Sequence, residues 1–179
     1  MQRVFVRASF LASLLPMLVL LPSAASAVSV GDQAQSFCLK DAHGGTQRLS
    51  SFRKRILVVW YEGVKSRLQN VWVKRRLAEL KRVGKLREQN YESVGIANFD
   101  ESALPGALIV SAIRQHTQSS TVQILLDREG VFRRAWGLHH GRSNIYVLDA
   151  RRRVIWRSSG PLTPRLGRQL VRMIVRRAR

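Results

Sequence analysis

The segment that most constrains the fold is the apolar run at 56–61, which is rich in β-branched and aromatic residues. Apolar residues in succession, without helical spacing, predict a buried central strand. A helical pattern follows almost at once, over about 66–88. Basic residues cover most of that helix, and its apolar face holds Val73, Leu77 and Leu80. A buried strand that leads directly into a helix favours an α/β fold.

The rest of the chain continues this alternation of strands and helices. Further strands are predicted at 35–40, 92–97, 121–126, 144–149 and 153–158. A helix of about 12 residues is predicted after Pro105, with an apolar stripe at Leu108, Ile109, Ala112 and Ile113. A terminal helix is predicted after the N-cap Thr163, with Leu166, Leu170, Met173 and Ile174 facing inward. The last two strands are so close in sequence that they imply an antiparallel hairpin. The order of elements predicts a mixed sheet with helices on its faces.

The first 27 residues have the pattern of a secretory signal peptide. Arg3 and Arg7 precede an apolar run at 8–21, and the small residues at 25–27 predict cleavage before Val28; a retained membrane anchor is the alternative. Cleavage removes two arginines and no acidic residue, so the net charge falls from +20 to +18. We therefore expect an exported bacterial protein, periplasmic or extracellular, with a signal peptide at 1–27, a single domain at 28–179 and no transmembrane segment after cleavage.

Four strings of this sequence, taken in order, resemble the thioredoxin-like superfamily. They are the segment at 30–52, the strand ILVVWYE at 56–62, the segment ILLDREGVFRRAWGL at 124–138, and the hairpin IYVLDARRRVIWRSSGPL at 145–162. The resemblance is to the redoxin branch, which includes alkyl hydroperoxide reductases and thiol-specific antioxidant proteins. NFDESALPG, AWGL and GPLTP are most similar to the YtfJ-type family of periplasmic proteins of unknown function. The resemblance implies a single thioredoxin-like domain and a compartment, and it implies no particular reaction.

The positions where this resemblance would place catalytic groups hold other residues. Redoxins use a thiolate at the N-terminus of the helix after the central strand, usually with a second cysteine that resolves the disulfide. Aligned without gaps, the two positions of the C-x-x-C motif are Lys65 and Leu68, and the cis-proline position is Ser143. Neither Lys65 nor Leu68 can form a thiolate, and the peptide bond before Ser143 should be trans. The alignment therefore predicts a degenerate active site.

Cys38 is the only cysteine in the chain and the one weak candidate for a catalytic thiol. It lies on the first predicted strand, away from the helix terminus where redoxins hold their thiolate. We expect a buried, inert packing residue, with an intermolecular disulfide as the alternative. His139 and His140 lie near the expected active face, but no cysteine pair, carboxylate or methionine cluster accompanies them. No metal and no other cofactor is predicted.

Basic residues gather in three places, and their positive potential favours anionic partners. The predicted anion-binding residues are Lys74, Arg75, Arg76, Lys81 and Arg82 on the first long helix, Arg151, Arg152 and Arg153 at the hairpin turn, and Arg172 and Arg176 on the terminal helix. The terminal helix also carries Arg165, Arg168, Arg177 and Arg179. A solvated, solubilising surface explains the same charges equally well.

Three functions remain open from the sequence. The first is a non-catalytic scaffold that binds an unknown protein or an anionic component of the cell envelope through its basic surface. The second is a thiol-dependent oxidoreductase or peroxidase that uses Cys38 alone. The third is a polyanion-binding module, for which nucleic acid would be an unspecific partner. The four tryptophans lie mostly in apolar patterns, so we expect them in the core and not on a base-stacking surface.

Overall fold

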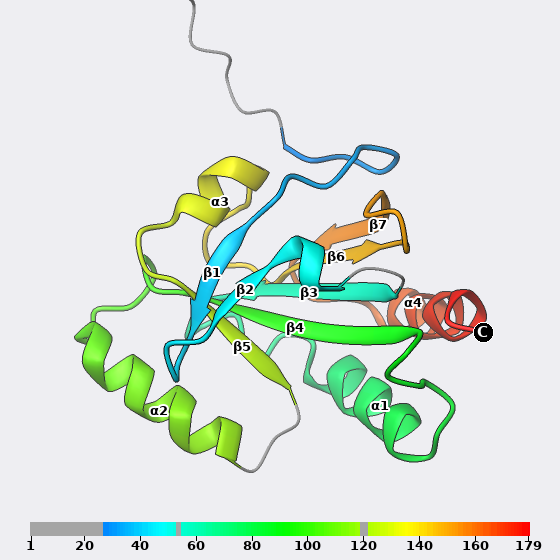
Figure 1. The fold of residues 1–179 in the computed structure, drawn as a ribbon, viewed down its shortest axis with the longest axis horizontal. Coiled ribbons are helices and arrows are strands. Elements are labelled where there is room, and N and C mark those ends of the chain that lie inside the picture. Colours follow the sequence, from blue (N-terminus) through cyan, green and yellow to red (C-terminus); the bar gives the residue numbers. More distant parts are fainter. Residues whose placement is uncertain (1–26, 53–54, 119–121) are drawn as a thin grey trace, which may run out of the picture.

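A seven-stranded mixed sheet forms the centre of the molecule in the computed structural model, which describes residues 27–52, 55–118 and 122–179 (Figure 1). The strands are β1 (Cys38–Asp41), β2 (Thr46–Arg48), β3 (Ile56–Glu62), β4 (Tyr91–Asn98), β5 (Gln123–Asp127), β6 (Asn144–Leu148) and β7 (Val154–Ser159). Their order in the sheet is β2-β1-β5-β4-β3-β6-β7. Strands β3, β4 and β5 are parallel to one another, and the outer strands are antiparallel to their neighbours.

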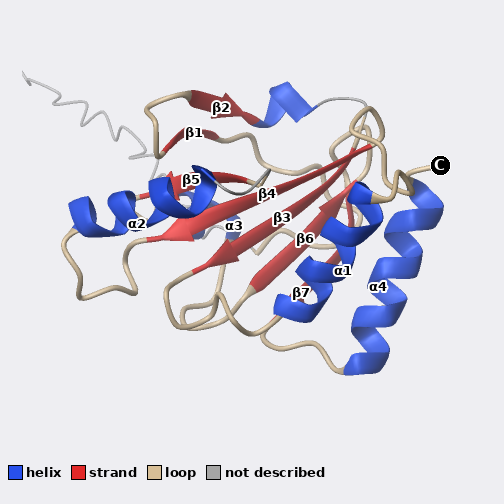
Figure 2. Ribbon diagram, turned by 90° about the horizontal axis from the view of Figure 1, so that it is seen from below, coloured by secondary structure: helices blue, strands red, loops and turns tan. Residues whose placement is uncertain are grey.

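Helices cover both faces of this sheet (Figure 2). The helices α1 (Val71–Arg82), α2 (Gly106–Gln118) and α4 (Pro164–Arg177) lie on one face, and the short helix α3 (Val131–Trp136) lies on the other with a 3₁₀ turn at Leu49–Phe52. Side chains of β3 alternate between the two cores, as the period of two requires. Val58 and Trp60 pack beneath α1 and α4, whereas Val59 and Tyr61 pack beneath α3. The predicted α/β class, a mixed sheet with helices on its faces in a single domain, is confirmed.

Helix α1 is shorter at both ends than the pattern over 66–88 predicts. Residues 64–70 form turns, in which the Ser66 hydroxyl accepts a hydrogen bond from the Gly63 backbone N–H at 2.9 Å. Asn70 precedes the helix, and its side chain makes no capping bond. The local polar contacts therefore replace the first helical turn that apolar spacing alone suggests.

Helix α4 begins as predicted but turns a different set of residues inward. The Thr163 hydroxyl accepts from the Leu166 backbone N–H at 3.3 Å, and Pro164 occupies the first turn. The buried residues are Gly167, Leu170, Val171 and Ile174. Leu166, predicted to face inward, is 45% exposed.

The other predicted elements are present, with local corrections. Helix α2 buries Val110, whereas Leu108, predicted on its apolar stripe, is exposed. Strands β6 and β7 form the predicted hairpin, and Arg152 in its turn has a left-handed φ of 67°. Trp60 and Trp136 lie in the core, but Trp72 is 38% exposed. Within the described ranges, no helix is long and apolar enough to cross a membrane. The predicted signal peptide lies outside the described residues except for Ala27.

Candidate functional site

The region where the resemblance places a redoxin active site lies at the carboxyl ends of the parallel strands. Glu62 ends β3, Asn98 ends β4 and Asp127 ends β5, and the register pairs Glu62 with Ala97 and Asn98 with Asp127. The carboxyl ends of parallel strands in open sheets are the usual place for ligand sites. Polar side chains from several loops meet at this edge.

Glu62 is the centre of the first polar cluster. Its Oε1 accepts a hydrogen bond from the Ser143 hydroxyl at 2.6 Å, and its Oε2 accepts from the Lys74 ammonium at 2.5 Å. Only 11% of the Glu62 side chain is exposed, and this burial raises the pKa of its carboxyl, while Lys74 and Ser143 oppose the rise. The cluster thus joins β3, α1 and the loop before β6.

Two amides beside Glu62 tie the loop after β3 to segments distant in sequence. The Gln69 side chain accepts from the Ser143 backbone N–H at 3.0 Å and donates to the Gly141 carbonyl at 3.2 Å. The buried Asn70 side chain accepts from the Leu162 backbone N–H at 2.9 Å and donates to the Gly160 carbonyl at 3.1 Å. We refer to Glu62, Gln69, Asn70, Lys74 and Ser143 together as the polar network. Its amides and carboxylate are bonded within the chain, so it fixes these loops in place.

A second group of polar residues lies on the α3 side of the same edge. Asp127 accepts from the Tyr61 hydroxyl at 3.1 Å and from the backbone N–H groups of Phe132 and Arg133 at 3.2 and 3.0 Å. Burial is the main cause that raises the pKa of Tyr61 well above its ordinary value, and the charge of Asp127 adds to it. These bonds hold the start of α3 against β3 and β5, which is a structural role.

Glu101 connects the loop after β4 to the loop before β6. Its Oε1 accepts from the Asn98 side chain and from the Gly141 backbone N–H, each at 2.8 Å, and lies 3.6 Å from His140 Nδ1. In the part of the chain that the structure describes, no three His, Cys, Asp or Glu side chains are grouped as a metal site would require.

Lys65, Leu68 and Ser143, which the alignment assigns to the redoxin motif positions, lie in the loops at this edge and carry no thiol. Lys65 and Leu68 are exposed in the turns after β3, and Leu68 is 69% exposed. Ser143 is fully buried, and no cis peptide bond occurs among the described residues. Ser143, which the alignment assigns to the position of the redoxin proline, thus carries a hydroxyl that donates to Glu62.

Cys38 is exposed, so the prediction of a buried packing residue is wrong. In β1 the side chains alternate, and the core-facing positions belong to Phe37 and Leu39, which leaves Cys38 on the open side. Strand β1 is separated from β3 by β5 and β4. Three strand spacings correspond to about 14 Å, so Cys38 does not take the place of a thiol at Lys65.

Several of the predicted anion-binding residues are occupied by other contacts. Arg152 is buried, and its guanidinium donates to the carbonyl oxygens of Phe52 and Arg55, while burial lowers its pKa. Lys74 is bound to Glu62, and Lys81 lies 3.0 Å from Glu88. Arg152 therefore stands outside any surface site, and Lys74 belongs to the polar network.

The other predicted basic residues lie at the surface, and the structure brings Arg76, Arg172 and Arg176 together along one open groove beside α1 and α4. Arg76 pairs with Glu79 at 2.5 Å, and Arg153 donates to the Gly31 carbonyl at 3.2 Å. The exposed residues with no ion pair to a described acid are Arg75, Arg82, Arg151, Arg153, Arg172 and Arg176. The structure brings Arg172 and Arg176 together with the further arginines of α4, which the charge pattern of the sequence already indicates.

The sheet order, the helices on both faces and the site at the carboxyl ends of the parallel strands define a thioredoxin-like protein. A thiol:disulfide interchange protein DsbE from Chlorobium tepidum has the same fold, with a TM-score of 0.64 and 16% identity over 86% of this chain and 100% of that one. A thiol peroxidase from Chromobacterium violaceum gives a TM-score of 0.59 and 15% identity over 86% and 91% of the two chains. The protein SMc02350 from Sinorhizobium meliloti 1021 gives 0.58 and 21% over 84% and 86%. At these identities the likeness shows the fold alone.

The sequence model of a bacterial protein family of unknown function, YtfJ_HI0045, matches residues 58–177, and the chain belongs to that family. No curated protein matches the sequence.

Proposed function

We propose that this protein is an exported, non-catalytic thioredoxin-like scaffold of the bacterial envelope that binds its partner through a basic surface. The observation that carries the proposal is the occupation of the redoxin site. The alignment assigns Lys65 and Leu68 to the thiol positions, and in the polar network Ser143 donates a hydrogen bond to Glu62. The groups of the polar network are bonded to one another, so none of them is free to act as a nucleophile. The buried Glu101 Oε2, which lies beside Gly63 at this edge, has no hydrogen-bond partner among the described residues, but a carboxylate oxygen does not replace a redox-active thiol.

Export is part of this proposal and rests on the sequence pattern at 1–27. Expression of the whole gene product in a bacterium, followed by fractionation and N-terminal sequencing, should yield a periplasmic chain that starts at Val28. If the chain retains residues 1–27 and stays in the cytoplasm, the proposed location in the envelope is wrong.

Thiol turnover is the experiment that tests the non-catalytic role. Disulfide reduction with insulin and consumption of hydroperoxide should both be absent, in the wild-type protein and in the Cys38→Ser variant alike. Thiol titration should give one thiol per chain in the wild-type protein, which shows that Cys38 is reduced, and none in Cys38→Ser. Robust turnover by the wild-type protein would refute the scaffold.

A second candidate function is supported by the exposure of Cys38. A Cys38 thiolate that attacks a hydroperoxide would become a sulfenic acid and release water or an alcohol. Two equivalents of an external thiol would then return the cysteine, with one disulfide and one water as products. Turnover that disappears in Cys38→Ser, together with a trapped sulfenic acid at Cys38, would support this function over the scaffold.

A further inference from the structure

Helix α4 presents a row of arginines that the rest of the described chain leaves without partners. The segment at 164–179 has six arginines and no acidic residue. None of the six side chains forms an ion pair or a hydrogen bond with another described residue, and all six are exposed. Four of them lie within α4 at spacings of three and four residues, which places them on one stripe: Arg165, Arg168, Arg172 and Arg176. At 1.5 Å per residue the stripe is about 17 Å long.

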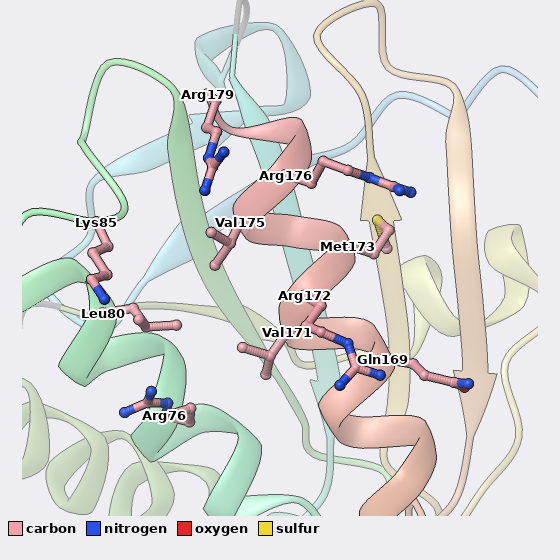
Figure 3. Close-up of a pocket in the computed structure, with 10 residues that line it drawn as sticks. All are labelled: Arg76, Leu80, Lys85, Gln169, Val171, Arg172, Met173, Val175, Arg176 and Arg179. Carbon is pink, nitrogen blue, oxygen red and sulfur yellow. The ribbon is translucent and has the colours of Figure 1, made fainter.

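Helix α1 lies beside α4 and runs in the same direction. Gly167 near the start of α4 packs against the ring of Trp72 at the start of α1. Further along, Leu80 of α1 and Val171 and Val175 of α4 line an open groove. Figure 3 shows Val171, Val175 and Arg179 directed toward α1, whereas Gln169, Met173 and Arg176 lie on the other flank of α4. Helix α4 is thus a ridge with Val171 and Val175 on the side of α1 and Met173 on the other side (Figure 3), and the groove beside it is open to solvent.

Apolar side chains reach the surface among these charges. Trp72 is 38% exposed, Leu166 is 45% exposed and Val83 is 50% exposed, and all three lie on α1 or α4 or directly beside them. A linear polyanion would bind the guanidinium groups but leave these apolar side chains in water. An anionic bilayer offers phosphate groups over an area and hydrocarbon beneath them.

We propose that the α1/α4 surface, formed by the four arginines of the stripe with Trp72 and Leu166, docks on an anionic phospholipid bilayer. The inference rests on the proposed function, because it names the partner of the scaffold's basic surface. Guanidinium groups bind phosphate oxygens in a bidentate manner and need no rearrangement here, since they have no protein partner to leave. Trp72 and Leu166 then enter the headgroup region, where an amphipathic tryptophan is favoured.

Vesicle binding of the purified processed chain tests this surface. Sedimentation with vesicles of phosphatidylglycerol and phosphatidylcholine is compared with vesicles of phosphatidylcholine alone, at about 0.15 M salt. Each basic side chain near an anionic surface is worth about a fivefold gain in affinity. The double variant Arg172→Gln/Arg176→Gln should therefore bind the anionic vesicles about 25-fold more weakly, and the neutral vesicles should bind little of either protein.

A matched control separates docking from net charge. Lys40 and Arg48 are exposed on β1 and β2, at the other end of the sheet from α4, and have no ion pair with a described acid. The variant Lys40→Gln/Arg48→Gln removes the same two charges and should lose less than about threefold, since these charges act from a distance. Equal losses in the two double variants would overturn the proposal, because they would indicate attraction by net charge alone.

The apolar part of the surface distinguishes a bilayer from a soluble polyanion. Leu166→Ser should weaken binding to anionic vesicles several-fold and leave binding to heparin unchanged. Unchanged vesicle binding in Leu166→Ser, with heparin and vesicle binding lost in parallel in the arginine variant, would identify a polyanion surface and refute the bilayer. Circular dichroism of each variant confirms that it is folded. Absence of vesicle binding in a protein without thiol turnover would refute this inference and leave the scaffold standing, whereas thiol turnover would refute the scaffold alone.

Discussion

The polar network and the α1/α4 surface are both rich in polar and charged groups, but they use them in opposite ways. In the polar network, Glu62 has two partners and the amides of Gln69 and Asn70 each accept one bond and donate another. On the α1/α4 surface, the arginines of α4 have no partner in the described chain. The polar groups of the network stabilise the fold by bonding to one another, whereas the guanidinium groups of α4 are free to bind another molecule.

This contrast follows from burial. A buried polar group without a partner costs about 1–3 kcal/mol, so a folded chain must pair the groups that it buries. The guanidinium group of an exposed arginine stays hydrated and needs no protein partner. Substitutions in the polar network should therefore affect the free energy of unfolding, and substitutions in the arginine stripe should affect binding without affecting unfolding.

The largest expected effect comes from Asn70→Ala. The substitution leaves the buried Gly160 carbonyl and Leu162 N–H without their side-chain partner, at the segment that leads from β7 into α4. We expect the free energy of unfolding to fall by roughly 2–4 kcal/mol, as measured by urea denaturation. Gln89→Ala, at an exposed side chain, is the control and should change it by less than about 0.5 kcal/mol. A small effect at Asn70 would mean that water replaces its two bonds.

A smaller loss is expected from Ser143→Ala. The variant removes the hydroxyl that donates to Glu62 and leaves a mostly buried carboxylate with Lys74 alone. The free energy of unfolding should fall by about 1–3 kcal/mol, and the exposed Ser50→Ala serves as its control in the same denaturation series. A neutral outcome would show that the hydroxyl at this position does not hold the loop before β6.

The sequence predicts the local parts of this architecture well because local signals carry them. The apolar run at 56–61 becomes β3, and Thr163 with Pro164 opens α4, since both features are fixed by neighbouring residues. The exposure of Cys38 could also have been predicted, because alternation assigns the inward positions to Phe37 and Leu39.

The polar network could not be predicted, because its partners are far apart in the chain. Glu62 and Ser143 are separated by 81 residues, and Asn70 and Leu162 by 92. The role of Arg152 could not be predicted for the same reason. In the sequence it cannot be distinguished from Arg151 and Arg153, but in the structure its backbone is left-handed and its guanidinium donates to carbonyl groups 97 and 100 residues earlier. Long-range hydrogen bonds leave no periodic pattern in the sequence that could identify them.

The pH dependence of Glu62→Gln sharpens the comparison within the polar network. Burial raises the pKa of Glu62 above its ordinary value of 4.5, so the folded protein holds its proton more tightly than the unfolded chain does. The stabilising contribution of this group is complete below the unfolded pKa and is lost as the pH rises through the folded pKa. The difference in unfolding free energy between wild type and Glu62→Gln should therefore shift against the wild type as pH increases above 4.5. Urea denaturation of both proteins over that range measures it, and a difference independent of pH would contradict the raised pKa.

The smallest effect on stability is expected from the arginine variant used for vesicle binding. Arg172→Gln/Arg176→Gln removes exposed side chains without protein partners, so the free energy of unfolding should change by no more than about 0.5 kcal/mol. Relief of repulsion along the stripe should make that change slightly stabilising at low salt, and added salt should abolish it. Urea denaturation at two salt concentrations measures both effects. A loss greater than about 1 kcal/mol would show that these arginines stabilise the fold. The α1/α4 surface would then resemble the polar network, and the proposed difference between the two regions would be wrong.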